Sequence, residues 1–512
     1  MTSGMLSVFC TICMILAQYG SSHGKCTDGW NKVLVTSSSG SVLFGQKANL
    51  IEAVKHGAEV RFYVDAWGGE GYLSSTQNAF FKNGEVCAQA LMHVSKSGWN
   101  GFHSNVYWWF VIICTTGNVH MSRWYVGAHT KVSETQTTVQ ITWFVRLFGN
   151  CELGDFKPLL CSEKNGSATC GNKNALADAV DNGADVRVLN HFNSQSGYMT
   201  PFSNIDINSN VVAGQYLWHV SQTHSGNHID FQSDAYWWFT MWSTGGTRDM
   251  SRWSVGSHQD RGHTSDKVAL EWFADTCWTL AYKHDRNGAN IKGSKDYLKS
   301  AILNGHRVKV IRNRYSIEAD NVQIKNGEVS AQLLGHVSKA SIQKFQDNAY
   351  WFWQHVSTTG DVNTVRYNVG SKTNRGNDDS KTEVSWFIDT RPWTHVLSTS
   401  SSGTATFGNK SKLIDAIKAG SMLRFVIHLG GEKLVLQADN MALNNGGTEL
   451  AAQTIRTISY TNDKIRKFQS NPYWYFSIVT TQGDVKTSKW TVGDHENRGG
   501  DSKKAAIDWF VN

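Results

Sequence analysis

The stretch that decides the fold of this chain is YWWFVIICTTGNVHMSRWYVG, at residues 107–127. It recurs without insertion or deletion at residues 236–256, 350–370 and 473–493. A Trp-Phe pair follows 16 residues after the last glycine of each copy, beginning at Trp143, Trp272, Trp386 and Trp509. Self-similarity at a fixed period is the signature of a repeat architecture. The sequence therefore contains four copies of one unit.

The repeat is long enough for each copy to be a domain. One position of the repeat is a glycine in all four copies, at Gly57, Gly183, Gly305 and Gly420. Successive glycines are 126, 122 and 115 residues apart. Globular domains commonly have this length, whereas the repeats of solenoids are much shorter. We therefore expect four tandem modules, at residues 25–150, 151–275, 276–390 and 391–512.

Each module contains the pattern of one helix. In the first module Leu50, Ala53 and Val54 put three apolar groups on one helical face, and the spacing recurs in the other copies. Good N-cap residues precede three of the four segments, and the repeated glycine follows all four. The remaining segments alternate apolar and polar residues, as half-buried strands do. The predicted fold class is α+β, with mostly antiparallel sheet and one packed helix per module.

The first 24 residues indicate a secretory signal peptide. They contain no Lys, Arg, Asp or Glu, and an apolar run extends from Leu6 to Ala17. This run is too short for a membrane span, and no later stretch is long and apolar enough to be a transmembrane segment. The expected location is therefore extracellular.

Removing this leader leaves seven cysteines. Cys161 and Cys170 flank a polar turn and can close a hairpin, and Cys87 and Cys114 lie within the first module. The number of cysteines is odd, so one thiol is left over. Two of the remaining three cysteines can join neighbouring modules, and these three are Cys26, Cys151 and Cys277. Disulfides are typical of secreted proteins. Glycosylation acceptors stand at Asn165 and Asn409.

Charge and motifs exclude several classes of function. The net charge of +7 is modest for 512 residues and forms no basic stripe, so nucleic acid is not an expected partner. The sequence has no nucleophile elbow, metalloprotease helix or phosphate-binding glycine loop, and no cofactor is predicted. His93, His219 and His336 share one repeated position, but the fourth copy has Arg456 there, so no metal site is predicted. An enzyme with one active module remains a third alternative.

The candidate binding residues follow the last glycine of the long repeat. The second, third and fourth modules share an Asp or Asn, then Arg and Gly, with a Lys at one later offset. The predicted site residues are Asp260, Arg261, Lys267, Asn374, Arg375, Lys381, Asn497, Arg498 and Lys504. A bidentate guanidinium on a turn suits a carboxylate, a sulfate or a sugar hydroxyl. The alternative is structural, with the Asp or Asn capping a turn and the Arg contacting a neighbouring module.

The first module has Lys131, Val132 and Ser133 at this place. If the predicted loop is a binding site, the first copy is therefore expected to lack it.

The tryptophan-rich segments also have two interpretations. Alternate side chains of a strand point to opposite faces, so at least half of these rings belong to a core. The other half could stack on a sugar. A basic residue between the aromatics is expected to lie over a Trp ring as a cation–π pair, at Arg123, Arg252, Arg366 and Lys489.

These observations favour a secreted, multivalent, non-catalytic binding protein of lectin-like type. It would recognise repeated glycans or other extracellular anionic groups through equivalent loops. The alternative is a structural extracellular protein that associates with itself, as in a matrix, a secretion or an adhesive.

Overall fold

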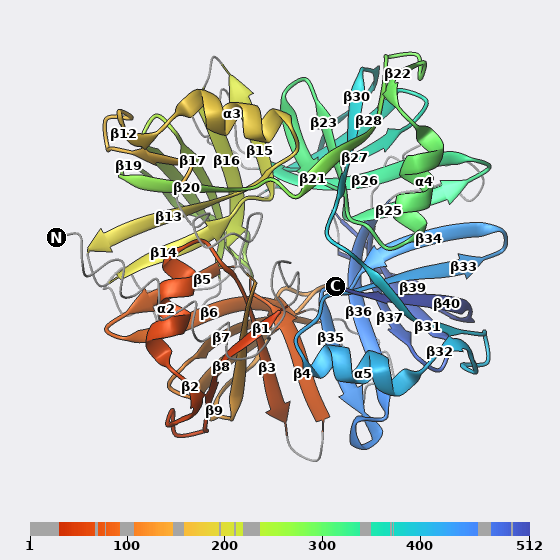
Figure 1. Ribbon diagram of the computed structural model, residues 1–512, viewed down its shortest axis with the longest axis horizontal. Coiled ribbons are helices and arrows are strands. Elements are labelled where there is room, and N and C mark those ends of the chain that lie inside the picture. The colour runs from red at the N-terminus through yellow and green to blue at the C-terminus, as the bar shows by residue number, and fades with distance from the viewer. Residues whose placement is uncertain are drawn as a thin grey trace, which may run out of the picture.

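Four antiparallel sheets of ten strands each surround a central axis, in a propeller-like arrangement (Figure 1). The computed structural model describes residues 30–66, 70–76, 78–92, 107–146, 158–193, 196–208, 211–218, 236–337, 350–368, 371, 373–458, 473–492 and 495–512. Strands account for 64% of these described residues and helices for 10%. The α+β prediction is therefore wrong, because the helix of each module is a short element beside an extensive sheet, and the chain is an all-β protein.

The strand order places elements from both ends of the chain in the first sheet. This sheet runs β2 (Val42–Gly45), β1 (Asn31–Thr36), β10 (Ile141–Arg146), β3 (Glu59–Ala66), β4 (Glu70–Ser75), β35 (Asn440–Asn444), β36 (Glu449–Ile458), β37 (Tyr473–Thr480), β38 (Asp484–Thr491) and β39 (Asn497–Lys504). The second runs β12 (Ala168–Gly171), β11 (Leu160–Ser162), β20 (Leu270–Asp275), β13 (Asp185–Asn193), β14 (Ser196–Pro201), β5 (Asn78–Lys82), β6 (Glu85–Met92), β7 (Tyr107–Cys114), β8 (Asn118–Tyr125) and β9 (Lys131–Thr138).

The other two sheets repeat this arrangement. The third runs β19 (Asp260–Lys267), β18 (Thr247–Ser254), β17 (Tyr236–Ser243), β16 (Val211–Trp218), β15 (Asn204–Asn208), β24 (Tyr315–Glu318), β23 (Val308–Arg312), β30 (Val384–Asp389), β21 (Trp278–His284) and β22 (Asn290–Gly293). The fourth runs β29 (Asn374–Lys381), β28 (Asp361–Asn368), β27 (Tyr350–Ser357), β26 (Glu328–Val337), β25 (Asn321–Lys325), β34 (Glu432–Gln437), β33 (Leu423–Leu429), β40 (Ala506–Val511), β31 (Thr394–Thr399) and β32 (Ala405–Gly408).

Each sheet is shared by two neighbouring modules. Five strands come from one module and five from the next, and they meet edge to edge at β14–β5, β15–β24, β25–β34 and β4–β35. The last of these pairings joins the first module to the fourth, with Ser74 opposite Asn440. The ring is therefore closed by backbone hydrogen bonds as well as by side chains.

The apolar clusters hold the helix of each module against its strands and also extend into neighbouring modules. In the first module Leu50, Ala53 and Val54 of the helix pack in one cluster with Phe62 of β3 and Trp143 of β10. Three residues of the second module complete that cluster, namely Leu189, Met199 and Phe273. The repeated Trp before Phe is fully buried in all four copies, at Trp143, Trp272, Trp386 and Trp509. The repeated Trp therefore lies in a module interior, and the Phe that follows it contacts a neighbouring module.

The helices lie where the sequence places them, at α2 (Lys47–Lys55), α3 (Lys173–Asp181), α4 (Lys295–Leu303) and α5 (Lys410–Lys418). A 3-10 turn, η1, covers Asn445–Gly447. The side chains of Asn172, Ser294 and Asn409 accept hydrogen bonds from backbone amides in the first helical turn, which confirms them as N-caps. Gln46 makes no such bond through its side chain.

The glycine after each helix forms the contact between modules. Its φ is 83° at Gly57, 92° at Gly183, 87° at Gly305 and 90° at Gly420, in the left-handed region that favours glycine. A Cβ atom at these positions would lie 2.6–2.9 Å from a Phe ring of the next module, on Phe273, Phe387, Phe510 and Phe144 in turn. The fourth of these contacts, Gly420 against Phe144, again joins the two ends of the ring.

Substitution of Gly420 tests this contact. The matched control is Gly431, whose φ is 88° but whose added Cβ would meet nothing within 4 Å. Gly431→Ala is expected to lower the free energy of unfolding by about 1 kcal/mol through backbone strain alone. Gly420→Ala should cost about 1–2 kcal/mol more, because Phe144 must move. Urea denaturation of both variants measures the difference, and equal losses would show that the contact with Phe144 does not matter.

A basic residue stands four positions after each of these glycines, and three of the four donate hydrogen bonds across a junction. Arg61 donates to the carbonyl oxygens of Gly420 (3.2 Å) and Ser421 (2.9 Å) in the fourth module. Arg187 donates to the carbonyl of Ala58 at 3.1 Å, and Lys309 to that of Gly183 at 2.7 Å. The helix C-terminus carries unpaired carbonyls and partial negative charge, so a buried cation is stabilised there.

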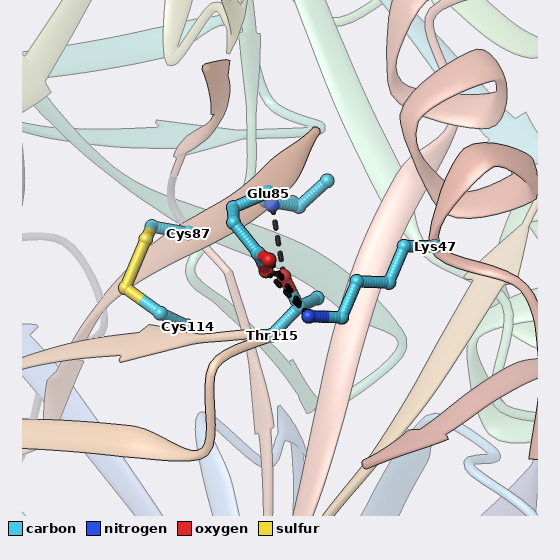
Figure 2. Close-up of a disulfide and its surroundings, with 6 residues drawn as sticks. Lys47, Glu85, Cys87, Cys114 and Thr115 are labelled. Atoms are coloured by element: carbon cyan, nitrogen blue, oxygen red, sulfur yellow. Dashed lines mark hydrogen bonds and ion pairs between the residues drawn. A yellow bond between two sulfur atoms is a disulfide. The ribbon is translucent and has the colours of Figure 1, made fainter. Parts of the chain in front are cut away.

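Two of the predicted disulfides are present. Cys87–Cys114 joins β6 to β7, and Cys161–Cys170 joins β11 to β12, which confirms both pairings. Figure 2 shows Cys87–Cys114 beside Glu85, to which Lys47 of α2 donates at 2.7 Å. Cys277 is a free thiol. Burial, together with the carboxylate of Asp275, raises the pKa of Cys277 to about 12, so its thiol is a poor nucleophile at neutral pH.

Several sequence predictions fall on residues outside those described. These are the signal peptide at residues 1–24, Cys26 and Cys151. Among the described residues, the longest helices span nine positions, and none could cross a bilayer. The disulfides are compatible with an extracellular protein.

Candidate functional site

The predicted binding loops are strands at the outer edge of three sheets. The three strands β19, β29 and β39 each end the strand order of a sheet, and every residue in them is exposed. They therefore carry all nine predicted site residues at the molecular surface. The equivalent strand of the first module, β9, is partly buried and lacks the Arg-Gly pair.

The Asp or Asn of each strand has a structural role. A side-chain oxygen accepts a hydrogen bond from the backbone amide of the glycine two residues later. The distances are 2.7 Å for Asp260, 2.6 Å for Asn374 and 2.7 Å for Asn497. The glycines have positive φ, and the register shifts beside them, so the chain bulges at the arginine. This fits the alternative in which the Asp or Asn shapes a turn.

The arginines themselves lie on the exposed side of these bulges. Arg498 forms a surface ion pair of 2.8 Å with Glu496, and about half of each side chain is exposed. The backbone carbonyl of Arg261 accepts a hydrogen bond of 3.1 Å from Arg252, which leaves the guanidinium of Arg261 outside that contact. An exposed ion pair contributes little to stability, so a ligand anion can replace it at small cost.

The lysines stand apart from the arginines. Lys267 lies six positions after Arg261 on one strand, which places them roughly 20 Å apart. Lys267 donates to Thr247 at 3.1 Å, while Lys381 and Lys504 pair with the aspartates that begin β28 and β38. The structure thus keeps each Arg beside its Asp or Asn but does not bring the Lys to them.

The repeated Tyr-Trp segments meet at the central axis. Four tryptophans, one per module, form a ring of edge-to-face contacts. The ring centroids are 5.8 Å apart for Trp108 and Trp237, 6.2 Å for Trp237 and Trp351, 6.0 Å for Trp351 and Trp474, and 6.1 Å for Trp474 and Trp108. Such contacts are favourable beyond the burial of apolar area. One face of each aromatic strand therefore holds the four modules together.

In three of these strands a cation lies over the aromatic residue that follows the ring tryptophan. Arg123 lies 5.4 Å from the centroid of Trp109, and Arg252 lies 5.5 Å from that of Trp238. Lys489 lies 5.9 Å from the centroid of Tyr475, so two of the four expected pairs with Trp are confirmed and a third is formed with Tyr instead. In the third module Arg366 forms an ion pair of 3.8 Å with Asp378.

A cavity of about 490 Å³ opens at the axis, beside the tryptophan ring. Its wall includes the four ring tryptophans, and its polar edge includes Asp185, Lys309 and Glu318. Burial by itself raises the pKa of Asp185, but the nearby charges of Lys309 and Arg307 hold that pKa below its usual range. The polar edge is therefore occupied by ion pairs of the module junction. Apolar walls with a few polar groups are typical of a small-molecule site.

Three histidines of the same cavity were missed by the sequence analysis. His129, His258 and His495 stand two residues after the repeated glycine in the first, second and fourth modules. Recurrence in three of four copies was the available signal. The prediction instead weighed His93, His219 and His336, of which the first two lie outside the described residues.

Comparisons with known proteins add little. No protein-family description matches the chain, and no curated protein matches its sequence. Among solved structures, the chain matches the crystal structure of the WD40 domain of SCAP from fission yeast at 7% identity. The match covers 88% of this chain and 84% of that one, with a TM-score of 0.11. Agreement this low carries no argument about fold or function.

Proposed function

We propose that the chain is a secreted, non-catalytic, multivalent binding protein. It contacts repeated glycans or other anionic groups through the arginines of β19, β29 and β39. The observation that supports this most strongly is that one Asp/Asn-Arg-Gly bulge occurs on three edge strands, with every residue exposed. An exposed planar guanidinium on a shaped backbone suits carboxylates, sulfates and sugar hydroxyls.

The closed ring gives these strands a multivalent arrangement. The three strands belong to three different sheets around one axis, so their spacing is fixed by the same contacts that hold the modules together (Figure 1). Weak sites at fixed spacing bind a repetitive ligand far more tightly than one site does. The strand β39 carries three basic residues and one acidic residue, whereas β19 and β29 each carry two of both, so β39 is expected to bind anions best of the three.

Array binding of the full chain tests this proposal. The array carries neutral, sialylated and sulfated glycans, and the variants are Arg261→Ala, Arg375→Ala and Arg498→Ala, singly and together. Each single variant is expected to weaken surface binding by roughly 10-fold and the triple variant by more than about 100-fold, because avidity multiplies weak sites. The control is Arg286→Ala, which removes an exposed guanidinium from a turn outside the three strands. Binding that survives in the triple variant would contradict the proposal.

A structural role is the second candidate, and one observation favours it. The opposite edges of three sheets expose apolar side chains, with 58% of Leu43 on β2, 51% of Ile291 on β22 and 53% of Phe407 on β32 accessible. Apolar edge strands can pair with those of another molecule. Concentration-dependent assembly that Ile291→Lys and Phe407→Lys abolish, with no binding on the array, would favour this role over the first.

A further inference from the structure

Three equivalent turns bring a histidine each to the central axis. The turns follow β8, β18 and β38, and their histidines are His129, His258 and His495. The ring centroid of His129 lies 4.3 Å from that of His258 and 4.1 Å from that of His495, and the outer two are 5.9 Å apart. His129 and His258 are buried, and His495 is partly buried. Three modules therefore supply one compact imidazole cluster.

The backbone holds these side chains in place. The amide of His129 donates to the carbonyl of Tyr125, and that of His258 to the carbonyl of Ser254, each at 3.0 Å. All three histidines have φ of 52–53°, a left-handed conformation that is uncommon outside glycine. Such outliers persist where the surrounding structure enforces them, and they cluster at functional sites.

The repeated glycine explains why the turns can approach so closely. A Cβ atom on Gly256 would lie 3.0 Å from the carbonyl oxygen of His129, and one on Gly127 would lie 3.2 Å from that of His495. The second of these would also lie 2.9 Å from Trp490. Side chains at these positions would therefore push the histidine turns apart.

We infer that this cluster binds one divalent transition metal ion, of which Zn²⁺ is the type. One nitrogen from each imidazole lies within 4.8 Å of the other two. Nitrogens that bind zinc at about 2.0–2.1 Å stand roughly 3.3 Å apart in a tetrahedral site, so small rotations of the side chains close the cluster around the ion. Imidazole is a preferred ligand of Zn²⁺, Cu²⁺ and Ni²⁺, whereas Mg²⁺ and Ca²⁺ prefer oxygen.

The site is open on the side of the cavity. All three histidines line the same space as the ring of tryptophans, so a fourth coordination position would face it. Three protein nitrogens with one open position are typical of zinc sites that exchange a water or a small ligand. The third module has Lys372 at the equivalent sequence position, outside the described residues. The ion would link the first, second and fourth modules.

Titration of the full chain with ZnCl₂ after removal of bound metal tests this inference. Calorimetry is expected to show one saturable ion per chain, and Mg²⁺ should not compete. His129→Ala, His258→Ala and His495→Ala should each weaken binding more than about 100-fold, since even residues that only orient a ligand contribute about 10–100-fold. Co²⁺ reports the geometry independently, because four-coordinate Co²⁺ gives visible absorption bands that each variant should lose.

The matched control is His263→Ala. His263 is exposed on β19, where it contacts Asp260, and it lies outside the cluster, so its loss should leave affinity and stoichiometry unchanged. Near-UV circular dichroism confirms that each variant is folded. Where an alanine variant does not fold, Gln replaces the same histidine instead, as in His258→Gln. The inference is overturned if the folded wild type binds no zinc, or if all three cluster variants bind zinc with the affinity of the wild type.

Discussion

Residues 391–512, expressed alone, are expected not to form a stable folded monomer. In the ring this module pairs β34 with β25 of the third module and β35 with β4 of the first. Without its neighbours both edges would present unpaired backbone groups, which template association with other chains. The axial residues Trp474 and Phe476, buried against the other modules, would also be exposed.

Size-exclusion chromatography with light scattering and circular dichroism measure this outcome. We expect aggregates or a closed oligomer, since the two free edges of one copy are complementary to those of another. Co-expression with residues 1–390 is the control, because it restores both edge pairings and should give a soluble complex. A monodisperse monomer that melts cooperatively would show that the module interior suffices by itself.

The local elements of this fold were predictable from the sequence. The helix pattern of Leu50, Ala53 and Val54 and the capping residue Asn172 concern neighbouring positions, so spacing along the chain was enough. The disulfide Cys87–Cys114 was predictable because both cysteines lie in one module. These features depend on interactions within a single copy of the repeat.

The arrangement of the modules was not predictable in this way. Edge-to-edge pairing of β4 with β35 joins residues of opposite ends of the chain, and backbone hydrogen bonds leave no side-chain signature in a sequence. The repeated glycines were recognised, but their partners, such as Phe144 for Gly420, lie in another module. The histidine cluster was missed for the same reason, because only the ring brings His129, His258 and His495 together.

The predicted arginine sites illustrate a different limit. Spacing correctly marked Arg261, Arg375 and Arg498 as equivalent positions, and the structure places them on equivalent strands. The spacing of residues could not distinguish the role of the arginine from that of the preceding Asp or Asn, whose side chain shapes the bulge. Ligand binding at these arginines stays a prediction for the array to test.

The second large effect is expected at Arg391, in the short connection between the third and fourth modules. Its guanidinium donates to both carboxylate oxygens of Asp389 at 2.6–2.9 Å and pairs with Asp275 at 3.0 Å. Both carboxylates are almost completely buried, with 0% and 1% of their side chains exposed. One cation therefore bridges carboxylates from the second and third modules at the ring junction.

Arg391→Met is expected to lower the free energy of unfolding by about 3–5 kcal/mol at pH 7, because it leaves buried carboxylates without their main partner. The control is Arg314→Met, which breaks a pair with Asp181 that is 47% and 39% exposed and should cost less than about 1 kcal/mol. Urea denaturation of both variants at pH 7 measures the difference. Equal losses would show that the buried cluster contributes no more than a surface pair.

The pH dependence distinguishes lost charge neutralisation from lost packing. Burial raises the pKa of Asp389, but Arg391 and Arg307 outweigh it and hold that pKa below its usual value. In the wild type the ionised carboxylate of Asp389 stabilises the fold fully at pH values above its pKa in the unfolded chain. This stabilisation is lost as the pH falls through the lower pKa that Asp389 has in the folded chain. In Arg391→Met burial is opposed only by Arg307, at 3.4 Å, and by more distant charges, so the pKa rises and the folded state takes up a proton more readily.

The stability deficit of Arg391→Met should therefore shrink as the pH falls from 7 towards 4, because protonation of Asp389 removes a charge that Arg307 only partly compensates. Adding Asp389→Asn should recover part of the loss at pH 7 for the same reason. A deficit that stays constant with pH, with no recovery in the double variant, would assign the effect to the lost volume of the arginine side chain. The ring junction would then depend on packing, as it does at Gly420 and Phe144, rather than on charge.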